Sequence, residues 1–86
     1  MYARSVKTKT LIEQSELSRF GKRVRDLRQG RGISQEELAA KANVHRTYIG
    51  MVERGEKNVT LLTMLRLADA LEVTLQELIE GVEDGK

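Results

Sequence analysis

Residues 34–55, SQEELAAKANVHRTYIGMVERG, predict two short helices joined by a tight turn. Ser34 followed by Glu37 forms a capping box, in which each side chain accepts a hydrogen bond from the backbone N–H of the other residue. Asn43 tolerates the left-handed backbone conformation that a sharp turn needs. The second helix spans roughly His45 to Arg54, and apolar residues follow helical spacing in both helices. The segment therefore predicts an α-helical fold.

The sequence on either side of this segment predicts three more helices, which gives an all-α fold of five helices. The first runs from about Ser15 to Gln29 and ends before a pair of glycines. Its apolar residues recur at spacings of three and four, at Leu17, Phe20, Val24 and Leu27. Thr60 caps a fourth helix that is apolar around much of its circumference, and Thr74 caps a short fifth helix. We expect residues 1–14 to form a basic arm, flexible or partly helical, and residues 15–82 to form the folded domain.

The composition restricts the classes of protein to which this chain can belong. With 86 residues it fits one small domain, which buries only about 60% of the surface that its unfolded chain exposes. Cysteine is absent and there is one histidine, so disulfides and an all-protein zinc site are excluded. No apolar run approaches the ~18 residues of a membrane span, and the N-terminus lacks the apolar region of a secretory signal. We expect a cytoplasmic protein without a cofactor, a metal, a membrane association or a small-molecule ligand.

Charge is distributed unevenly along the chain. Residues 1–57 contain 13 Lys/Arg and 7 Asp/Glu, a net charge of +6, whereas residues 58–86 contain 2 and 6, a net charge of −4. A basic N-terminal part with an acidic C-terminal part favours a polyanion-binding face that is separate from another function. Ordinary solvated helix faces would give the same distribution. An enzyme is not expected, because the sequence has no nucleophile–base set, no metal-ligand cluster and no glycine-rich phosphate loop.

Two short helices joined by a turn of three or four residues, with a small residue at their crossing, are the pattern of a helix-turn-helix. SQEELAAKANVHRTYIGMVERGEKNVTLLTMLRLADALEV resembles the phage-repressor/Cro-like (XRE) family of DNA-binding proteins. The resemblance covers residues 16–80 and rests on Gln35, Leu38-Ala39, Ile49, Val52 and the closing Glu53-Arg54-Gly55. HRTYIG, ERGEKN and NVTLLTM are most similar to the controller proteins of restriction–modification systems. The resemblance implies a lambda-repressor-like domain that binds double-stranded DNA. Asn43 stands where the family commonly has glycine, and it keeps the same conformational option.

The helix of residues 45–54 has one face for the core and an opposite face for a ligand. At 100° per residue the inward direction is set by two apolar residues, Ile49 and Val52. The opposite arc carries Arg46, Thr47, Gly50, Met51 and Arg54. The resemblance implies that this arc lies in the major groove, where we expect base contacts from Arg46, Thr47 and Met51. Arg46 can pair bidentately with guanine, although a solvated surface arginine would fit the same position.

Contacts to the DNA backbone are expected to be more numerous and less specific. Ser34 and Gln35 lie at the N-terminus of the first motif helix, where free N–H groups favour an anion. The expected partners beyond the second motif helix are Arg54, Lys57 and Asn58. His45 caps the helix, approaches a phosphate or is an ordinary surface residue. Tyr48 presents its hydroxyl to the backbone or packs half-buried.

Gly50 interrupts the second motif helix, at a cost of about 1 kcal/mol relative to alanine. We interpret it as a position at which the helix closely approaches DNA, and neutral drift at an exposed site is the alternative. The resemblance also implies a structural ion pair between Arg28, late in the first helix, and Glu53.

The leading functional hypothesis is a homodimeric, sequence-specific transcriptional regulator, a restriction–modification controller that reads a pseudo-palindromic operator near its own gene. The apolar fourth and fifth helices are expected to form the dimer interface, through Leu62, Leu67, Leu71, Val73 and Ile79. The alternative is an antitoxin of a toxin–antitoxin pair. Such a protein would use the same apolar surface to bind a toxin, and would touch DNA only for autoregulation.

Overall fold

Five α-helices follow one another in the structure, a computed structural model that describes residues 6–83, with side chains from Gln14 onward. They are α1 (Val6–Gly30), α2 (Gln35–Ala42), α3 (Arg46–Glu53), α4 (Leu61–Leu71) and α5 (Leu75–Leu78). Within the described range there is no strand. The prediction of an all-α, five-helix fold is confirmed.

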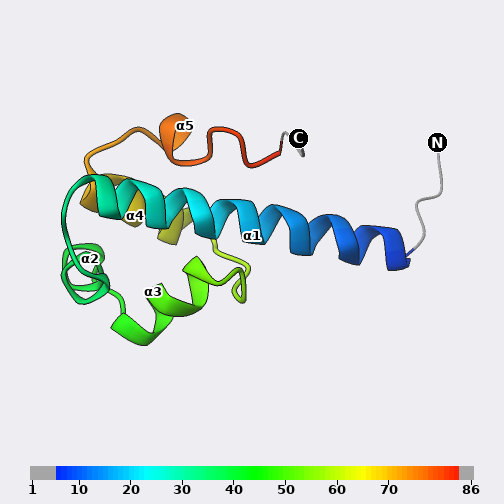
Figure 1. Cartoon of the computed structure of the whole chain (residues 1–86), viewed down its shortest axis with the longest axis horizontal. Helices are drawn as coiled ribbons and strands as arrows, with labels where there is room; N and C mark the ends of the chain where they lie inside the picture. Colours follow the sequence, from blue (N-terminus) through cyan, green and yellow to red (C-terminus); the bar gives the residue numbers. More distant parts are fainter. Residues whose placement is uncertain (1–5, 84–86) are drawn as a thin grey trace.

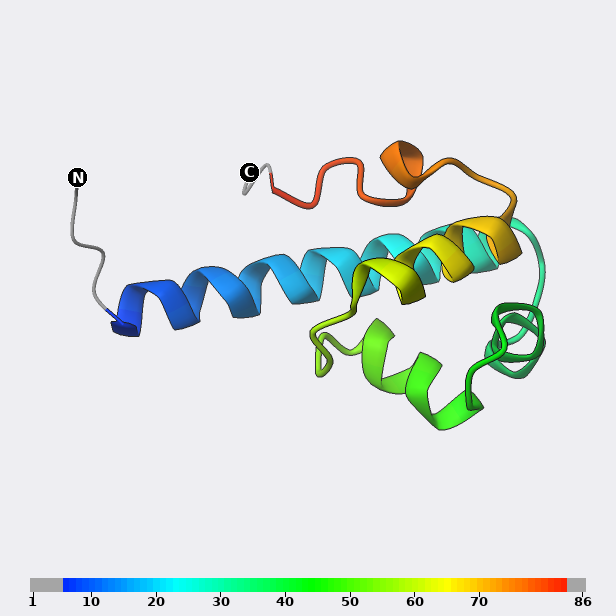
Figure 2. The same cartoon turned by 180° about the vertical axis from the view of Figure 1, so that it is seen from behind.

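Helix α1 is the long element along which the others are arranged (Figure 1). It begins at Val6, whereas the sequence predicted a start near Ser15. The prediction was late because the first residues show only weak apolar periodicity and no capping signal. Its N-terminal half extends beyond the other helices in both views (Figures 1 and 2). Residues 1–5 of the predicted arm lie outside the described residues. No helix in the described part of the chain combines the length and the apolar character that crossing a membrane requires.

The core lies where α1 to α4 meet, and α5 closes it. The largest fully buried side chains are Leu38, Ile49, Leu67, Leu71, Leu78, Val24 and Val52. Each of these contributes about 1.5–3 kcal/mol through the apolar surface that it removes from water. The inward stripe of α3 is the predicted one, so the opposite side of α3 is left to face outward.

Helix α4 has one apolar face in the core and further apolar residues at the surface. The prediction that Leu67 and Leu71 contact a second subunit is wrong, because both are 0% exposed within their own chain. Val73 packs half-buried against the same core. Among the described side chains, the exposed large apolar ones are Leu61, Leu62, Leu65 and Ile79. Of the five residues predicted for the interface, Leu62 and Ile79 are therefore the exposed ones.

The segment that follows α4 is held on α1 by two arginine side chains. Arg19 donates from Nε to the carbonyl oxygen of Val82, and Arg23 donates from Nε to the carbonyl oxygen of Glu77 at 2.9 Å. The carbonyl of Glu77 lies at the end of α5, where backbone acceptors lack partners within the helix. The acidic C-terminal segment therefore covers the side of α1 that is turned away from α2 and α3 (Figure 1).

Candidate nucleic-acid interface

Local hydrogen bonds define how α2 and α3 begin. Ser34 Oγ accepts from the backbone N–H of Glu37 at 3.0 Å, and Glu37 Oε1 accepts from the backbone N–H of Ser34 at 2.8 Å. Asn43, with φ 59° and ψ 47°, makes the left-handed turn that ends α2. His45 Nδ1 accepts from the backbone N–H of Thr47 at 3.1 Å and caps α3. The capping box, the turn at Asn43 and the capping alternative for His45 are confirmed.

Helix α1 positions α3 through a close backbone contact at Gly21. A β-carbon on Gly21 would overlap the carbonyl oxygen of Val52 and would lie 2.6 Å from that of Glu53. Because real β-carbons essentially never come so close, only glycine permits this approach. The end of α3 therefore rests directly on the backbone of α1.

Arg28 and Glu53, the predicted ion pair, join the same two helices. Arg28 Nε lies 2.7 Å from Glu53 Oε2, and Arg28 Nη2 donates to Glu53 Oε1 at 3.2 Å. The two side chains are 12% and 3% exposed. Arg28 Nη1 also donates to the carbonyl oxygen of Ile33, and Gln35 Nε2 donates to Glu53 Oε1, both at 2.9 Å. The network ties α1, the loop before α2, α2 and α3 into one unit, and it sets the orientation of the Gln35 amide.

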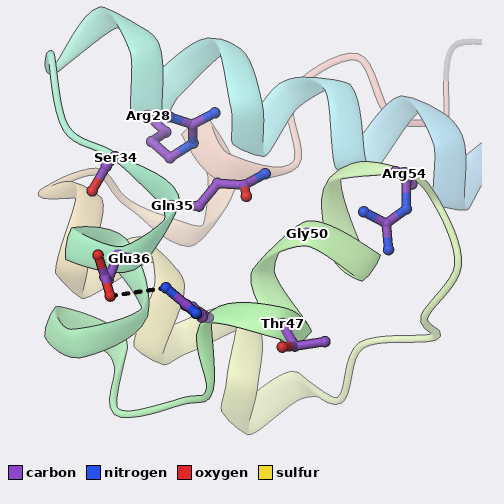
Figure 3. A pocket seen from close by; sticks show the side chains of 8 residues that line it. Arg28, Ser34, Gln35, Glu36, Thr47, Gly50 and Arg54 are labelled. Atoms are coloured by element: carbon purple, nitrogen blue, oxygen red, sulfur yellow. Dashed lines mark hydrogen bonds and ion pairs between the residues drawn. The ribbon is translucent and has the colours of Figure 1, made fainter.

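An open pocket of about 510 Å³ lies between α2 and α3 (Figure 3). Its lining residues are Arg28, Ser34, Gln35, Glu36, Arg46, Thr47, Gly50 and Arg54. Five of these were predicted to contact DNA, Gly50 was predicted as a close approach and Arg28 as a structural residue. The structure therefore brings five of the ten predicted DNA-contact residues, together with Gly50, to one concave surface between the two motif helices.

Arg46 enters this surface paired with a residue that the sequence did not single out. Its Nη1 lies 3.2 Å from Glu36 Oε2, the contact drawn as a dashed line in Figure 3. The side chains are 66% and 73% exposed, so the pair is weak and solvent competes with it. The sequence alone does not indicate this role for Glu36, because the helix dipole already accounts for an acidic residue in the first turn of a helix. The pair forms because the N-terminal ends of α2 and α3 lie close together in space. The spacing of residues along the sequence does not show this proximity.

Arg54 lies at the other end of α3 and is paired with Glu56. Its Nε and Nη2 donate to the two carboxylate oxygens of Glu56 at 3.0 and 3.2 Å. This hydrogen bonding lowers the pKa of the Glu56 carboxyl and raises the pKa of the guanidinium. Both groups stay charged at neutral pH.

Gly50 faces the pocket, but it is not an open surface position. The alternative interpretation, neutral drift at an exposed site, is wrong in its premise, because Gly50 is buried beneath neighbouring side chains. A β-carbon there would lie 3.1 Å from Arg54 Nη1 and 3.8 Å from Gln35 Oε1. Gly50 is covered because a long side chain at the end of a helix folds back over the preceding turn.

The remaining predicted contacts lie around the pocket or away from it. Tyr48 packs half-buried against the core, and Met51 is half-buried on α3. Lys57 and Asn58 are exposed in the loop after α3 and do not line the pocket. Asn58 instead borders a smaller groove of about 180 Å³, whose other walls include Phe20, Met64 and Ile79.

Comparisons with known proteins agree with this geometry. A family model described as helix-turn-helix matches residues 24–78. Control protein C.SmaI of Serratia marcescens is 50% identical over 56 residues, which are 65% of this chain and 67% of that protein. Control protein C.BamHI of Bacillus amyloliquefaciens is 40% identical over 62 residues, 71% of this chain and 76% of that protein. The crystal structure of the restriction-modification controller protein C.AhdI from Aeromonas hydrophila superposes with a TM-score of 0.71 at 48% identity, covering 72% of this chain and 94% of that one.

Proposed function

This chain belongs to the helix-turn-helix family, and from that premise we propose that it is a DNA-binding transcriptional regulator, the controller of a restriction–modification system. The observation that carries the proposal is the division of α3 into two sides. Ile49 and Val52 are fully buried, while Arg46 and Thr47 are exposed on the wall of the pocket. Similarity to C.SmaI, C.BamHI and C.AhdI supports the controller type. The proposal includes no catalytic step and no cofactor, and it places the protein in the cytoplasm.

Base readout is assigned to the start of α3. In a helix-turn-helix, the N-terminal residues of the second helix contact base edges in the major groove. Among the described residues Arg46 is paired only with an exposed carboxylate, so its guanidinium can exchange that partner for guanine O6 and N7. Thr47 can hydrogen-bond a base edge or contact a thymine methyl. Met51, half-buried on the same helix, supplies an apolar contact.

Backbone contacts surround this centre and supply most of the affinity. The start of α2 presents free N–H groups together with Ser34 and Gln35, and this arrangement favours a phosphate. His45 accepts its capping bond at Nδ1, which leaves Nε2–H as a donor toward DNA. The other proposed donors are Tyr48, Arg54, Lys57 and Asn58.

A second copy of the chain is proposed to cover the exposed apolar side chains Leu61, Leu62, Leu65 and Ile79. Exposed leucines close together on one helix are typical of a surface that a partner covers. A two-fold dimer would present two α3 helices to successive major grooves about 34 Å apart, which matches a pseudo-palindromic operator.

The test is selection of DNA duplexes from a random pool with the purified chain, followed by sequencing. We expect an enriched pseudo-palindrome that also occurs in DNA flanking the protein's own gene. Arg46→Ala should lower affinity for the enriched duplex about 5- to 150-fold, the value of one bidentate base contact, with a smaller loss on random duplex. Arg31→Ala is the matched control, because Arg31 is an exposed arginine paired with Glu72 away from the pocket. No enriched sequence, or equal losses on both duplexes for Arg46→Ala, would contradict base readout.

The same exposed apolar residues favour one alternative, an antitoxin whose surface binds a toxin. Sedimentation of the purified chain separates the two functions. A stable dimer without any partner supports the regulator, whereas a monomer whose apolar residues stay exposed supports the antitoxin.

A further inference from the structure

Gly50 has an unusual environment for a glycine in the middle of a helix. It lies on the ligand-facing side of α3, yet it is buried. The groups above it are the guanidinium of Arg54 and the amide oxygen of Gln35. A β-carbon 3.1 Å from Arg54 Nη1 would be closer than the ~3.5–4.0 Å of optimal van der Waals contact. A methyl group there would therefore press against the tip of the arginine, which would have to shift by a few tenths of an ångström.

The Arg54 guanidinium uses its nitrogens in two directions. Nε and Nη2 donate to Glu56, and Nη1 is the nitrogen nearest to Gly50. Among the described residues no hydrogen bond to Nη1 is found, so its two N–H groups remain donors at the wall of the pocket.

The Gln35 amide on the opposite wall is held more firmly. Its Nε2 donates to Glu53 Oε1, whose carboxylate is itself fixed by Arg28 and almost fully buried. One N–H of the Gln35 amide is thereby used, and the second remains available. Figure 3 shows Gln35 and Arg54 on different helices, with Gly50 between them.

We propose that Gly50 is a positioning residue for Arg54. Its missing β-carbon leaves a seat for the guanidinium above the helix, from which Arg54 Nη1 donates to a DNA phosphate at the wall of the pocket. This inference rests on the proposed DNA-binding function and goes beyond it by assigning the role of Gly50. The exposed pair with Glu56 opposes the phosphate contact only weakly, since solvated ion pairs contribute little. Gly50 therefore acts through a side chain of its own chain, rather than through the distance between α3 and DNA.

A double-mutant cycle tests the seat. Wild type, Gly50→Ala, Arg54→Gln and the double variant are titrated against a fluorescein-labelled duplex enriched by wild type from the random pool. Arg54→Gln should lower affinity about tenfold, as expected for one charged hydrogen bond. Gly50→Ala should lower it at least about threefold in the wild-type background, with no further loss in the Arg54→Gln background, which is the signature of coupled residues.

The salt dependence gives a readout that a purely structural role would not change. One lost phosphate contact reduces the slope of log K against log salt concentration by about 0.9. We expect this reduction for Arg54→Gln and a reduction toward the same value for Gly50→Ala. Gly30→Ala is the matched control, because a β-carbon on Gly30 meets nothing within 4 Å, and its slope and affinity should equal those of wild type. Thermal melts establish that each variant is folded.

Three results would overturn the inference or its premise. If Gly50→Ala weakens binding by the same factor with and without Arg54, close approach of α3 to DNA is the correct explanation and the seat is refuted. If Gly50→Ala binds as wild type does, neither explanation holds. If wild type enriches no duplex and binds none in the pool, the proposed function itself fails.

Discussion

Replacing Glu53 with glutamine should remove a large share of the stability of this domain. Glu53 accepts three hydrogen bonds from two residues, and its side chain is 3% exposed against 12% for Arg28. An exposed pair is worth about 0–1 kcal/mol, whereas removal of one partner of a buried pair costs about 3–5 kcal/mol. The exposures place this pair near the buried limit. Glutamine keeps one oxygen, which can still accept two of the three bonds, so we expect about 3 kcal/mol.

Urea unfolding followed by circular dichroism measures this loss, since the midpoint shifts while the slope stays constant if only stability changes. For a domain of this size, about 3 kcal/mol corresponds to a melting temperature roughly 12–24 °C lower. Glu56→Gln is the matched control, because Glu56 also pairs with an arginine through both oxygens but is exposed. Its midpoint should stay close to that of wild type. Equal shifts for the two variants would show that burial does not set the strength of the Arg28–Glu53 pair.

A double variant, Arg28→Met with Glu53→Met, tests the origin of the cost. With both charges removed no buried charge is stranded, so the double variant should be more stable than Glu53→Gln alone. A double variant less stable than the single one would mean that the pair itself, and not the stranded charge, supplies the energy.

Three further predictions concern other parts of the chain. Gly21→Ala should cost about 3 kcal/mol in unfolding free energy, through the overlap with α3, while Gly30→Ala in the same urea assay should not. Leu62→Lys should leave the chain folded, because the side chain is 58% exposed, but should convert a sedimenting dimer to a monomer. Lastly, the backbone N–H of Thr74 lowers the folded-state pKa of Glu77. The contribution of Glu77 to folding stability is therefore fully present above the unfolded pKa of about 4.3 and is lost as pH falls through the lower folded value. The decline of unfolding free energy below about pH 5 should therefore be shallower in Glu77→Gln.

Local signals in the sequence were sufficient to predict where most helices begin and end. The capping box of Ser34 and Glu37, the turn at Asn43 and the cap at Thr60 each involve groups only a few residues apart. Such contacts form whenever the backbone is helical nearby, so their residues can be recognised without knowledge of the tertiary structure. Helix α1 lacked such a signal at its start, and its first residue was placed too late.

Contacts between helices were harder to predict. The periodicity of α4 showed apolar residues on more than one face, but it did not reveal that neighbouring helices cover Leu67 and leave Leu65 exposed. The partners of the long side chains depend on which helix ends meet, so the pair of Glu36 with Arg46 was not foreseen. The Arg28–Glu53 pair was available only through the family resemblance, because 25 residues separate the partners in sequence.

The hydrogen-bond network around Glu53 also affects how a genetic screen should be interpreted. Arg28 and Glu53 hold the Gln35 amide at the pocket, and Glu53 is almost fully buried. A selection for loss of repression or activation would therefore recover substitutions at both positions, although Glu53 is too deep to reach a ligand. Normalising each variant to its folded fraction in the cell would separate these scaffold positions from residues that read DNA.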